Sequence, residues 1–439
     1  MSLTTSIYTS VNGMNAMASG FSVIGDNLAN MNTTGFKESR ALFSDILGSK
    51  MQESGVGSEI QAVDTQFQQG TLATTGNPLD FAIEGNGFFI VKDTAKGDTD
   101  FYTRAGSFKA DKNYYFVNGE GLRLQGYQVD NAGNVSTTLG DLHFPLDPAG
   151  DVTTPPTATT TATVQANLGA ADEKPEHAWS LDPVNGPALG SSNFITKFNV
   201  YDNYIAYDTT DPQNVKTLTN PPHEVNVYYA KTGDNTWQAH VVWNAGKTTN
   251  NYQEQVIDLN FDTNGNLTNQ TGPTNVTMTW DPAWNAAAQT VAINFADPEH
   301  KTTQYGSPDS TAFLGIDGSA SGGLTNFITN SNGEIFGIFS NGQKERLAQL
   351  ALAHFNAPTE LKNVGGNLFA QTNESGDALI STPASKGAGT INPASLEMSS
   401  VDLAGEFVNM LTMQRAFQAN TSVMQTTNQM YTTLVNLQT

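Results

Sequence analysis

The residue types that most often build catalytic and metal sites are sparse in this chain of 439 residues. It has no cysteine, which excludes disulfides, thiol nucleophiles and thiolate-bound metals. Its histidines are scattered, and no two have the i,i+4 spacing that places a pair of imidazoles on one helical face for a metal. They are His143, His177, His223, His240, His300 and His354. We therefore expect no metal site, no cofactor and no catalytic residues.

One loop has a weak likeness to a calcium site. In DTNGNL, residues 262–267, an acidic residue opens a run rich in Asn and Gly. However, Leu267 stands where a calcium loop needs glycine, and no glutamate occupies the twelfth position. A hairpin turn is the better interpretation, because Asn-Gly between apolar-rich runs favours a tight turn. The sequence also contains no phosphate-cradling glycine loop and no nucleophile elbow, so the chain is not expected to be an enzyme.

Charge is distributed unevenly along the chain. The formal net charge of −22 argues against nucleic acid as a partner, because phosphate binding needs a basic face. Residues 1–35 carry one charged side chain, Asp26, and residues 398–439 carry only Asp402, Glu406 and Arg415. No stretch reaches the roughly 18 continuous apolar residues of a membrane span. The N-terminus lacks the basic-then-apolar order of an ordinary secretory signal. We expect a solvated acidic middle, two nearly uncharged ends and no membrane insertion.

Both ends repeat apolar residues at a spacing of seven, which forms a stripe along an α-helix. We therefore expect terminal helices over 1–30 and 396–439. Mixed columns flank the C-terminal stripe, a pattern typical of a coiled-coil-like seam with interspersed polar residues. The stripe residues are Ile7, Met14, Phe21 and Leu28 at the start, and Leu403, Met410, Phe417, Met424 and Tyr431 at the end.

Two interpretations of these stripes are open at this point. The stripes could pack the two helices together within one molecule, or they could face neighbouring subunits. The second is favoured, because two such helices bury little if they pair only with each other, and exposed apolar patches mark partner surfaces. We expect the stripe residues to be subunit-interface residues.

Between its ends the sequence predicts β structure. Asn-Gly pairs recur between apolar-rich runs, and FAIEGNGFFIVK at 81–92 predicts a hairpin around Gly85-Asn86-Gly87. Repeated turn signals of this kind are typical of β-sandwich or barrel-like domains.

A run rich in Pro and Thr near 146–165 marks the best domain boundary. We interpret 146–303 as an outer β domain inserted into an inner β domain made from 73–145 and 304–395. Residues 31–72 are expected to be a hinge and connecting segment. All five tryptophans lie in the inserted block: Trp179, Trp237, Trp243, Trp280 and Trp284.

Several segments resemble one known family. NLANMNTTGFK at 27–37 resembles the signature shared by the rod and hook proteins of the bacterial flagellum. Residues 76–91 and 102–127 are similar to the inner-domain hallmark of that family, and residues 396–424 and 430–437 are similar to its C-terminal helix. The chain is identified as a member of the flagellar rod and hook protein family. It departs from the family pattern at Ser400, where Asn is usual, and at Phe417, where Tyr is common.

The resemblance implies a mainly β fold with discontinuous β domains and long α-helical N- and C-termini that pair in a coiled-coil-like inner layer. The implied function is structural: a subunit that self-assembles into a curved tubular universal joint and transmits torque from the rod to the filament. Length and the inserted block favour a hook subunit over a distal rod or hook–filament junction protein. A secreted β-rich adhesin is a more distant alternative.

The resemblance also assigns expected roles to short motifs. The hinge motif would let the chain leave the helix and turn towards the β domains, because Asn, Thr and Gly favour turns. Phe43 and Leu47 form a loose Phe-x-x-x-apolar pattern and are a candidate export signal. The hinge motif consists of Asn27, Asn30, Asn32, Thr33, Thr34, Gly35 and Phe36.

The expected partners follow from the same family. They are further copies of the chain in a helical homopolymer, rod and hook–filament junction proteins, the hook cap during assembly, and the flagellar type III export apparatus. The implied location is the extracellular flagellar hook, reached from the cytoplasm without a cleaved signal peptide.

Overall fold

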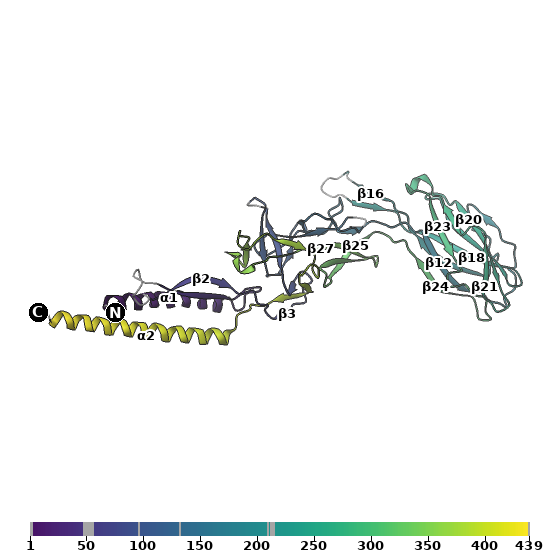
Figure 1. Cartoon of the computed structure of the whole chain (residues 1–439). Coiled ribbons are helices and arrows are strands. Elements are labelled where there is room, and N and C mark those ends of the chain that lie inside the picture. Colours follow the sequence, from purple (N-terminus) through teal and green to yellow (C-terminus); the bar gives the residue numbers. More distant parts are fainter. Residues whose placement is uncertain are drawn as a thin grey trace. The chain divides into compact units, whose positions relative to one another are not determined.

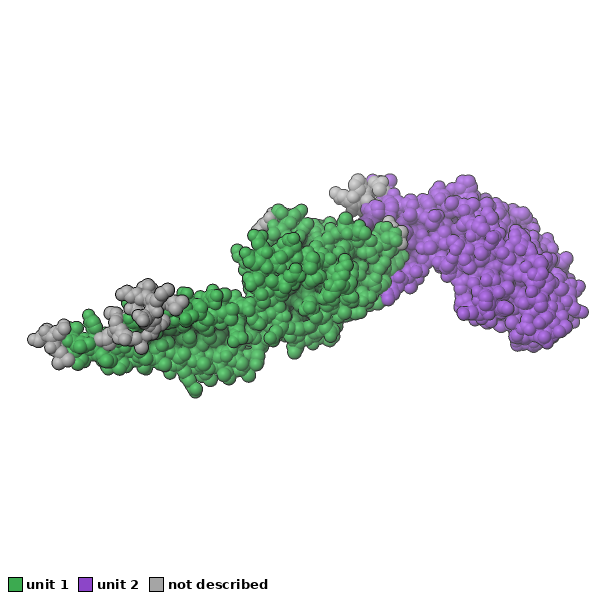
Figure 2. Space-filling view, in the orientation of Figure 1, with its two compact units in different colours: residues 1–144, 327–337, 345–439 green, residues 145–326, 338–344 purple. Residues whose placement is uncertain are grey.

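The computed structural model describes residues 3–46, 57–94, 97–130, 133–208, 210 and 216–437. The fold-class prediction is confirmed: most regular elements are strands, and one long helix lies at each end of the chain (Figure 1). Helix α1 spans Leu3–Ala29 and α2 spans Leu403–Leu437. The chain divides into two compact units (Figure 2). Unit 1 is Met1–Phe144, Phe327–Gly337 and Glu345–Thr439, and unit 2 is Pro145–Asn326 and Ile338–Lys344.

Helix α2 begins at Leu403 rather than at the predicted residue 396. Ser395–Glu397 form strand β33, which pairs antiparallel with β3 (Leu72–Thr74). Asp402 caps the helix, because its carboxylate accepts a hydrogen bond from the amide of Ala404 at 3.0 Å. The apolar spacing continues N-terminal to this cap, so spacing alone placed the helix start too early.

The segment after α1 is more ordered than a plain connection. Strands β1 (Ser39–Asp45) and β2 (Ser58–Thr65) pair antiparallel, with an irregularity between Leu42 and Phe43. This hairpin lies along α1 (Figure 1). It gives the helix a second neighbour besides α2.

Unit 1 contains a sheet with the strand order β27-β9-β5-β6-β30-β29. Aromatic and aliphatic side chains such as Phe88, Ile90 and Phe369 form a core on it. The bounds are β4 Phe81–Glu84, β5 Phe88–Asp93, β6 Thr99–Thr103, β7 Lys109–Ala110, β8 Phe116–Val117, β9 Arg123–Gln128, β10 Gly140–Asp141, β27 Lys344–Leu350, β28 Leu352–His354, β29 Lys362–Gly365, β30 Leu368–Ala370, β31 Leu379–Ser381 and β32 Thr390–Pro393; a short 3-10 helix spans Pro358–Glu360. The chain passes from unit 2 to unit 1 within strand β25 (Gly322–Thr329) and back to unit 2 within strand β26 (Glu334–Phe339).

The predicted hairpin at 81–92 is wrong. Strand β4 pairs with β32, whereas β5 pairs with β6 and β9. The backbone does turn there, with φ of 100° at Gly85 and 128° at Gly87. The turn carries the chain from one sheet to another, and the Asn86 carbonyl accepts a hydrogen bond from the Gly389 amide at 2.7 Å. Local turn chemistry therefore identified the turn but not the strands that pair.

Unit 2 contains a β-sandwich. A five-stranded sheet, β15-β18-β19-β20-β21, and a four-stranded sheet, β22-β23-β12-β24, share one buried core that includes Tyr229, Trp237 and Phe295. The bounds are β11 Thr153–Thr154, β12 Thr161–Asn167, β13 Leu181–Asp182, β14 Gly186–Pro187, β15 Phe194–Val200, β16 Ile205–Asp208, β17 Lys216–Thr219, β18 His223–Gly233, β19 Thr236–Asn244, β20 Tyr252–Phe261, β21 Leu267–Thr271, β22 Asn275–Met278, β23 Gln289–Asn294 and β24 Ser310–Ile316; a 3-10 helix spans Pro282–Trp284.

The calcium-like loop is a hairpin turn between β20 and β21, as the sequence indicated. One carboxylate oxygen of Asp262 accepts hydrogen bonds from the amides of Asn264 and Asn266, at 2.9 and 2.8 Å. Gly265 has φ of 80°. The carboxylate of Asp262 is therefore hydrogen-bonded to backbone amides of its own turn.

The chain returns from unit 2 later than the sequence indicated. We expected the inner domain to resume at residue 304, but residues 304–326 belong to unit 2. The reason is β24, which pairs antiparallel with β12 and completes the four-stranded sheet.

Candidate assembly surface

The two terminal helices pack against each other in antiparallel orientation within unit 1 (Figure 1). Their facing positions follow one another in steps of seven residues. Asn27 donates a hydrogen bond from Nδ2 to Glu406 Oε1 at 3.1 Å. A Cβ on Gly20 would lie 2.7 Å from Met413 Sδ. In the same way, a Cβ on Gly13 would lie 2.7 Å from Asn420 Nδ2.

This intramolecular seam is made mainly of small and polar residues. Gly13 and Gly20 have no side chain, so Asn420 and Met413 can approach the α1 backbone closely. Ser10 and Ala16 are also buried. The sequence analysis followed the apolar stripe and missed the role of these glycines at the contact. The sequence did contain a signal for this role: Gly13, Gly20 and Asn27 lie seven residues apart and therefore on one face of the helix.

The predicted apolar stripe of α2 lies outside this seam. Leu403, Phe417, Met424 and Tyr431 are 41%, 37%, 36% and 52% exposed, and Met410 is half-buried. Such a concentration of apolar surface is unusual for an isolated soluble chain and marks a partner surface. Further exposed large apolar side chains on α2 are Phe407, Val408, Leu411, Val423, Met430, Leu434 and Val435.

The apolar stripe of α1 is intermediate in its exposure to solvent. Ile7, Met14, Phe21 and Leu28 are half-buried, and Met14 Sδ accepts a hydrogen bond from Thr421 Oγ1 at 3.4 Å. Within one chain these residues are therefore neither fully covered nor fully open. Their assignment to subunit interfaces, like that of the α2 stripe, stays a prediction.

The first residues of the hinge motif fasten the end of α1. Asn27 is fully buried, donates to the Ser39 carbonyl at 2.7 Å and accepts from the Ser39 amide at 2.9 Å. Asn30 donates to the Asp26 carbonyl at 3.0 Å, and Thr33 donates to Asn30 Oδ1 at 3.1 Å. These bonds end the helix and start β1 beside it.

The later residues of the motif turn the chain into the β part of unit 1. Gly35 has φ of 70°, and a Cβ there would lie 2.4 Å from the backbone nitrogen of Ala105. Phe36 is buried, Asn32 is exposed, and the Thr34 carbonyl accepts a hydrogen bond from Asn367 at 3.0 Å. Their use as a hinge stays a prediction.

A buried ionic cluster that the sequence did not reveal lies beside this turn. Glu397 Oε1 is 2.6 Å from Lys37 Nζ, and Glu397 Oε2 is 3.4 Å from Arg104 Nη1. The side chains of Lys37 and Glu397 are fully buried, and that of Arg104 is 4% exposed. Burial lowers the pKa of Lys37 and of Arg104, and the charge of Glu397 opposes both shifts. The Gly70 amide also donates to Glu397 Oε1, at 2.9 Å.

The candidate export signal is only partly visible. Phe43 lies in β1, is 39% exposed, and its ring atom Cζ would be 3.2 Å from a Cβ on Gly20. Leu47 lies outside the described residues. The export role of the pair stays a prediction.

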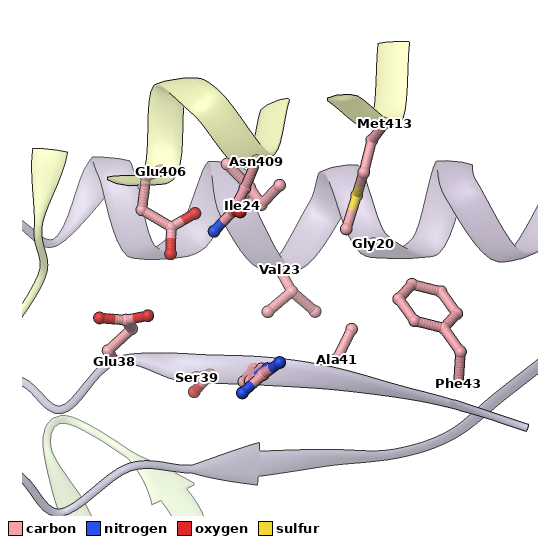
Figure 3. Close-up of a pocket in the computed structure, with 11 residues that line it drawn as sticks. Gly20, Val23, Ile24, Glu38, Ser39, Ala41, Phe43, Glu406, Asn409 and Met413 are labelled. Carbon is pink, nitrogen blue, oxygen red and sulfur yellow. The ribbon is translucent and has the colours of Figure 1, made fainter. Parts of the chain in front are cut away.

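A pocket of about 360 Å³ lies between α1, α2 and β1 (Figure 3). Glu38, just before β1, and Glu406, on α2, point towards each other across it. Glu406 is 4% exposed; its Oε1 accepts from Asn27, whereas its Oε2 has no hydrogen-bond partner. Burial and then the neighbouring Glu406 raise the pKa of Glu38. Arg40 also lines the pocket.

The described residues lack two further features, a metal-binding cluster and a membrane-spanning helix. Within the described ranges, no group of three or more His, Asp or Glu side chains is arranged to hold a metal ion. No helix in that part of the chain is long and apolar enough to cross a membrane.

Comparisons with known proteins agree with the geometry of the terminal helices. Four family descriptions match: "Flagella basal body rod protein" at residues 7–37, "Flagellar hook protein FlgE/F/G D1 domain" at 82–167, "Flagellar basal body protein FlaE D2 domain" at 221–319 and "Flagellar basal body rod FlgEFG protein C-terminal" at 393–437. The flagellar hook protein FlgE of Escherichia coli K12 is 32% identical over 97% of this chain and 98% of its own length. The chain belongs to the flagellar hook protein family.

Other hook-family members match over a similar length. FlgE of Salmonella typhimurium is 33% identical over 97% of this chain and 98% of its own, and FlgE of Treponema pallidum is 31% identical over 98% and 99%. Among solved structures, the Helicobacter pylori flagellar hook protein FlgE2 matches with a TM-score of 0.45 and 14% identity over 74% of this chain and all of that one.

Membership of the hook family makes the chain a structural subunit of the bacterial flagellar hook and a component of cell motility. Rod and junction proteins are not favoured as alternatives, because hook proteins match over almost the whole length. The family is structural rather than enzymatic, its members self-associate, and the hook lies outside the cell.

Proposed function

We propose that this hook-family subunit polymerises into a curved tube that works as a universal joint and passes torque from the rod to the filament. Head-to-tail contacts that do not close into a ring generate such a helical polymer. The surface that we assign to these contacts is the exposed stripe of α2, together with the half-buried stripe of α1.

One observation carries the proposal: α2 uses the mixed column of Glu406, Met413 and Asn420 for the intramolecular contact and leaves its apolar column open. Asn420 faces Gly13. The neighbouring Phe417 and Met424 remain more than one-third exposed. Complete burial of a side chain of this size contributes about 1.5–3 kcal/mol. Covering the area still exposed at the five stripe positions contributes part of this free energy at each and so favours association, and copies of the same chain offer a matching surface.

We also propose a radial order for the polymer. The terminal helices would form the innermost layer, the β part of unit 1 the inner domain, and unit 2 the outer domain. The charge distribution supports this order, because residues 1–35 and 398–439 together carry only four charged side chains. Helices with so few charges can be surrounded by neighbours without burying unpaired ions.

The remaining roles rest on family membership. We propose that the rod, the hook–filament junction proteins and, during assembly, the hook cap contact this polymer. We further propose that the subunit is exported by the flagellar type III apparatus without a cleaved signal peptide, with Phe43 and Leu47 in the export signal. Nothing in this role requires a cofactor, a metal or catalysis.

Purified full-length chain tests the proposal. After treatment with a precipitant, negative-stain electron microscopy is expected to show short curved tubes. A reconstruction of these tubes should place α1 and α2 at the smallest radius and the sandwich of unit 2 at the largest. Closed rings, or single chains at every precipitant concentration, would contradict the proposed polymer. Tubes with the helices on the outside would contradict only the radial order.

A further inference from the structure

The pocket between α1, α2 and β1 has an unsatisfied acidic interior. Glu406 is almost fully buried, yet its Oε2 accepts no hydrogen bond. A buried carboxylate oxygen without a donor costs free energy, so such a group normally has a partner in the functional state. Glu38 faces it across the pocket, and Asp402 adds a third negative charge nearby. Arg40 supplies one positive charge at the lining and forms no ion pair within the described part of the chain.

The terminal helices carry a single basic side chain that could satisfy this pocket. Arg415 is the only Lys or Arg in residues 1–35 and 398–439. It is exposed, and it forms no ion pair in the described part of the chain. It lies four residues after Leu411, which is 53% exposed, and seven after Val408, which is 62% exposed. This spacing puts all three on one helical face, turned away from Met413 and the seam with α1.

We propose that, in the assembled polymer, Arg415 of one subunit inserts between Glu38 and Glu406 of a neighbouring copy. The inference rests on the polymer proposed above and adds a residue-level contact to it. A guanidinium suits this place, because it is planar, always charged and presents several N–H donors to two carboxylates at once. Val408 and Leu411, on the same face of α2, would be covered at the same contact.

This contact would also fix the register between subunits. The apolar stripe repeats every seven residues, so a neighbour that slips by one heptad still meets apolar side chains. A single cation that matches a single acidic pocket distinguishes the correct register from the slipped ones. Polar and ionic groups in otherwise apolar seams serve this purpose in coiled coils.

A charge-reversal experiment on the full-length chain tests the pairing. The measured quantity is the critical concentration, taken as the unpolymerised chain left in the supernatant after the tubes are sedimented. We expect Arg415→Glu to raise it about a hundredfold or more, because breaking a buried charge pair leaves carboxylates uncompensated. Adding Glu38→Arg to Arg415→Glu should lower the critical concentration again towards that of the wild type. Arg415→Lys, which keeps the charge but not the planar fork, should have a smaller effect than Arg415→Glu.

A second double-mutant cycle, with a milder substitution at position 38, guards against variants that fail to fold. Glu38→Gln removes the charge with little change of shape, so in the Arg415→Glu background it should also recover part of the assembly. Circular dichroism of each variant checks the helices. If Arg415→Glu assembles like the wild type, or if the effects at positions 38 and 415 simply add, the pairing is wrong while the polymer proposal stands. If the wild type itself forms no tubes, both proposals fail together.

Discussion

Replacing Phe417 by aspartate is expected to abolish tube formation. Phe417 is 37% exposed in the single chain, so a carboxylate there can remain hydrated before assembly. In the polymer the same carboxylate would be buried without a partner, at a cost of several kcal/mol per subunit. The contact repeats in every subunit, so the polymer should not form. The measurement is sedimentation together with electron microscopy at concentrations where the wild type assembles completely.

Two controls accompany this variant. Phe417→Tyr introduces the residue common in the family and should assemble as the wild type does. All five tryptophans lie in unit 2, so thermal unfolding followed by tryptophan fluorescence reports on that unit alone. This transition should be unchanged in the Phe417→Asp variant. Tubes formed by that variant would show that position 417 does not face a neighbouring subunit.

Replacing Glu397 by glutamine is expected to destabilise unit 1 by about 3–5 kcal/mol, because one partner is removed from a buried ionic cluster. Lys37 and Arg104 would lose the carboxylate that stabilises their charged forms in a site from which water is excluded. Their pKa values are already lowered by burial, and the opposing effect of Glu397 would be lost. Amide exchange of β33 and of the turn at Gly35 measures the change directly.

A matched control is available in the same unit. The ion pair between Arg346 and Glu334 is partly exposed, with side chains 30% and 20% accessible. Because such pairs contribute about 0–1 kcal/mol, Glu334→Gln should change the stability of unit 1 only slightly. An equally small change for Glu397→Gln would mean that the buried cluster does not hold the turn in place.

The terminal helices show what the sequence could and could not predict. The heptad spacing of residues such as Met14 and Phe417 predicted both helices, because periodicity is a local property of the chain. It did not reveal that Gly13 faces Asn420, because spacing does not state which column of one helix meets which column of another. The cap at Asp402 was hidden for a similar reason: the apolar repeat runs through it.

The β domains repeat this division between local and long-range information. The turn at Asp262 was predicted correctly, because its Asn and Gly residues determine both the turn and the pairing of the adjacent strands. At Gly85 the turn chemistry was equally clear, but β4 pairs with the distant β32. The cluster of Lys37, Arg104 and Glu397 likewise joins three distant segments, and no local pattern indicates such a meeting.

The central claim is that neighbouring copies cover the apolar stripe of α2, and chemical labelling tests it most directly. The chain has no cysteine, so one introduced cysteine gives a single labelling site. The Met424→Cys variant should react quickly with a maleimide in dilute solution, where Met424 is 36% exposed, and slowly in assembled tubes. The Leu189→Cys variant, at a residue of unit 2 that is 95% exposed, should react quickly in both states. If the Met424→Cys variant reacts in tubes as fast as the Leu189→Cys variant does, the stripe is not the assembly surface.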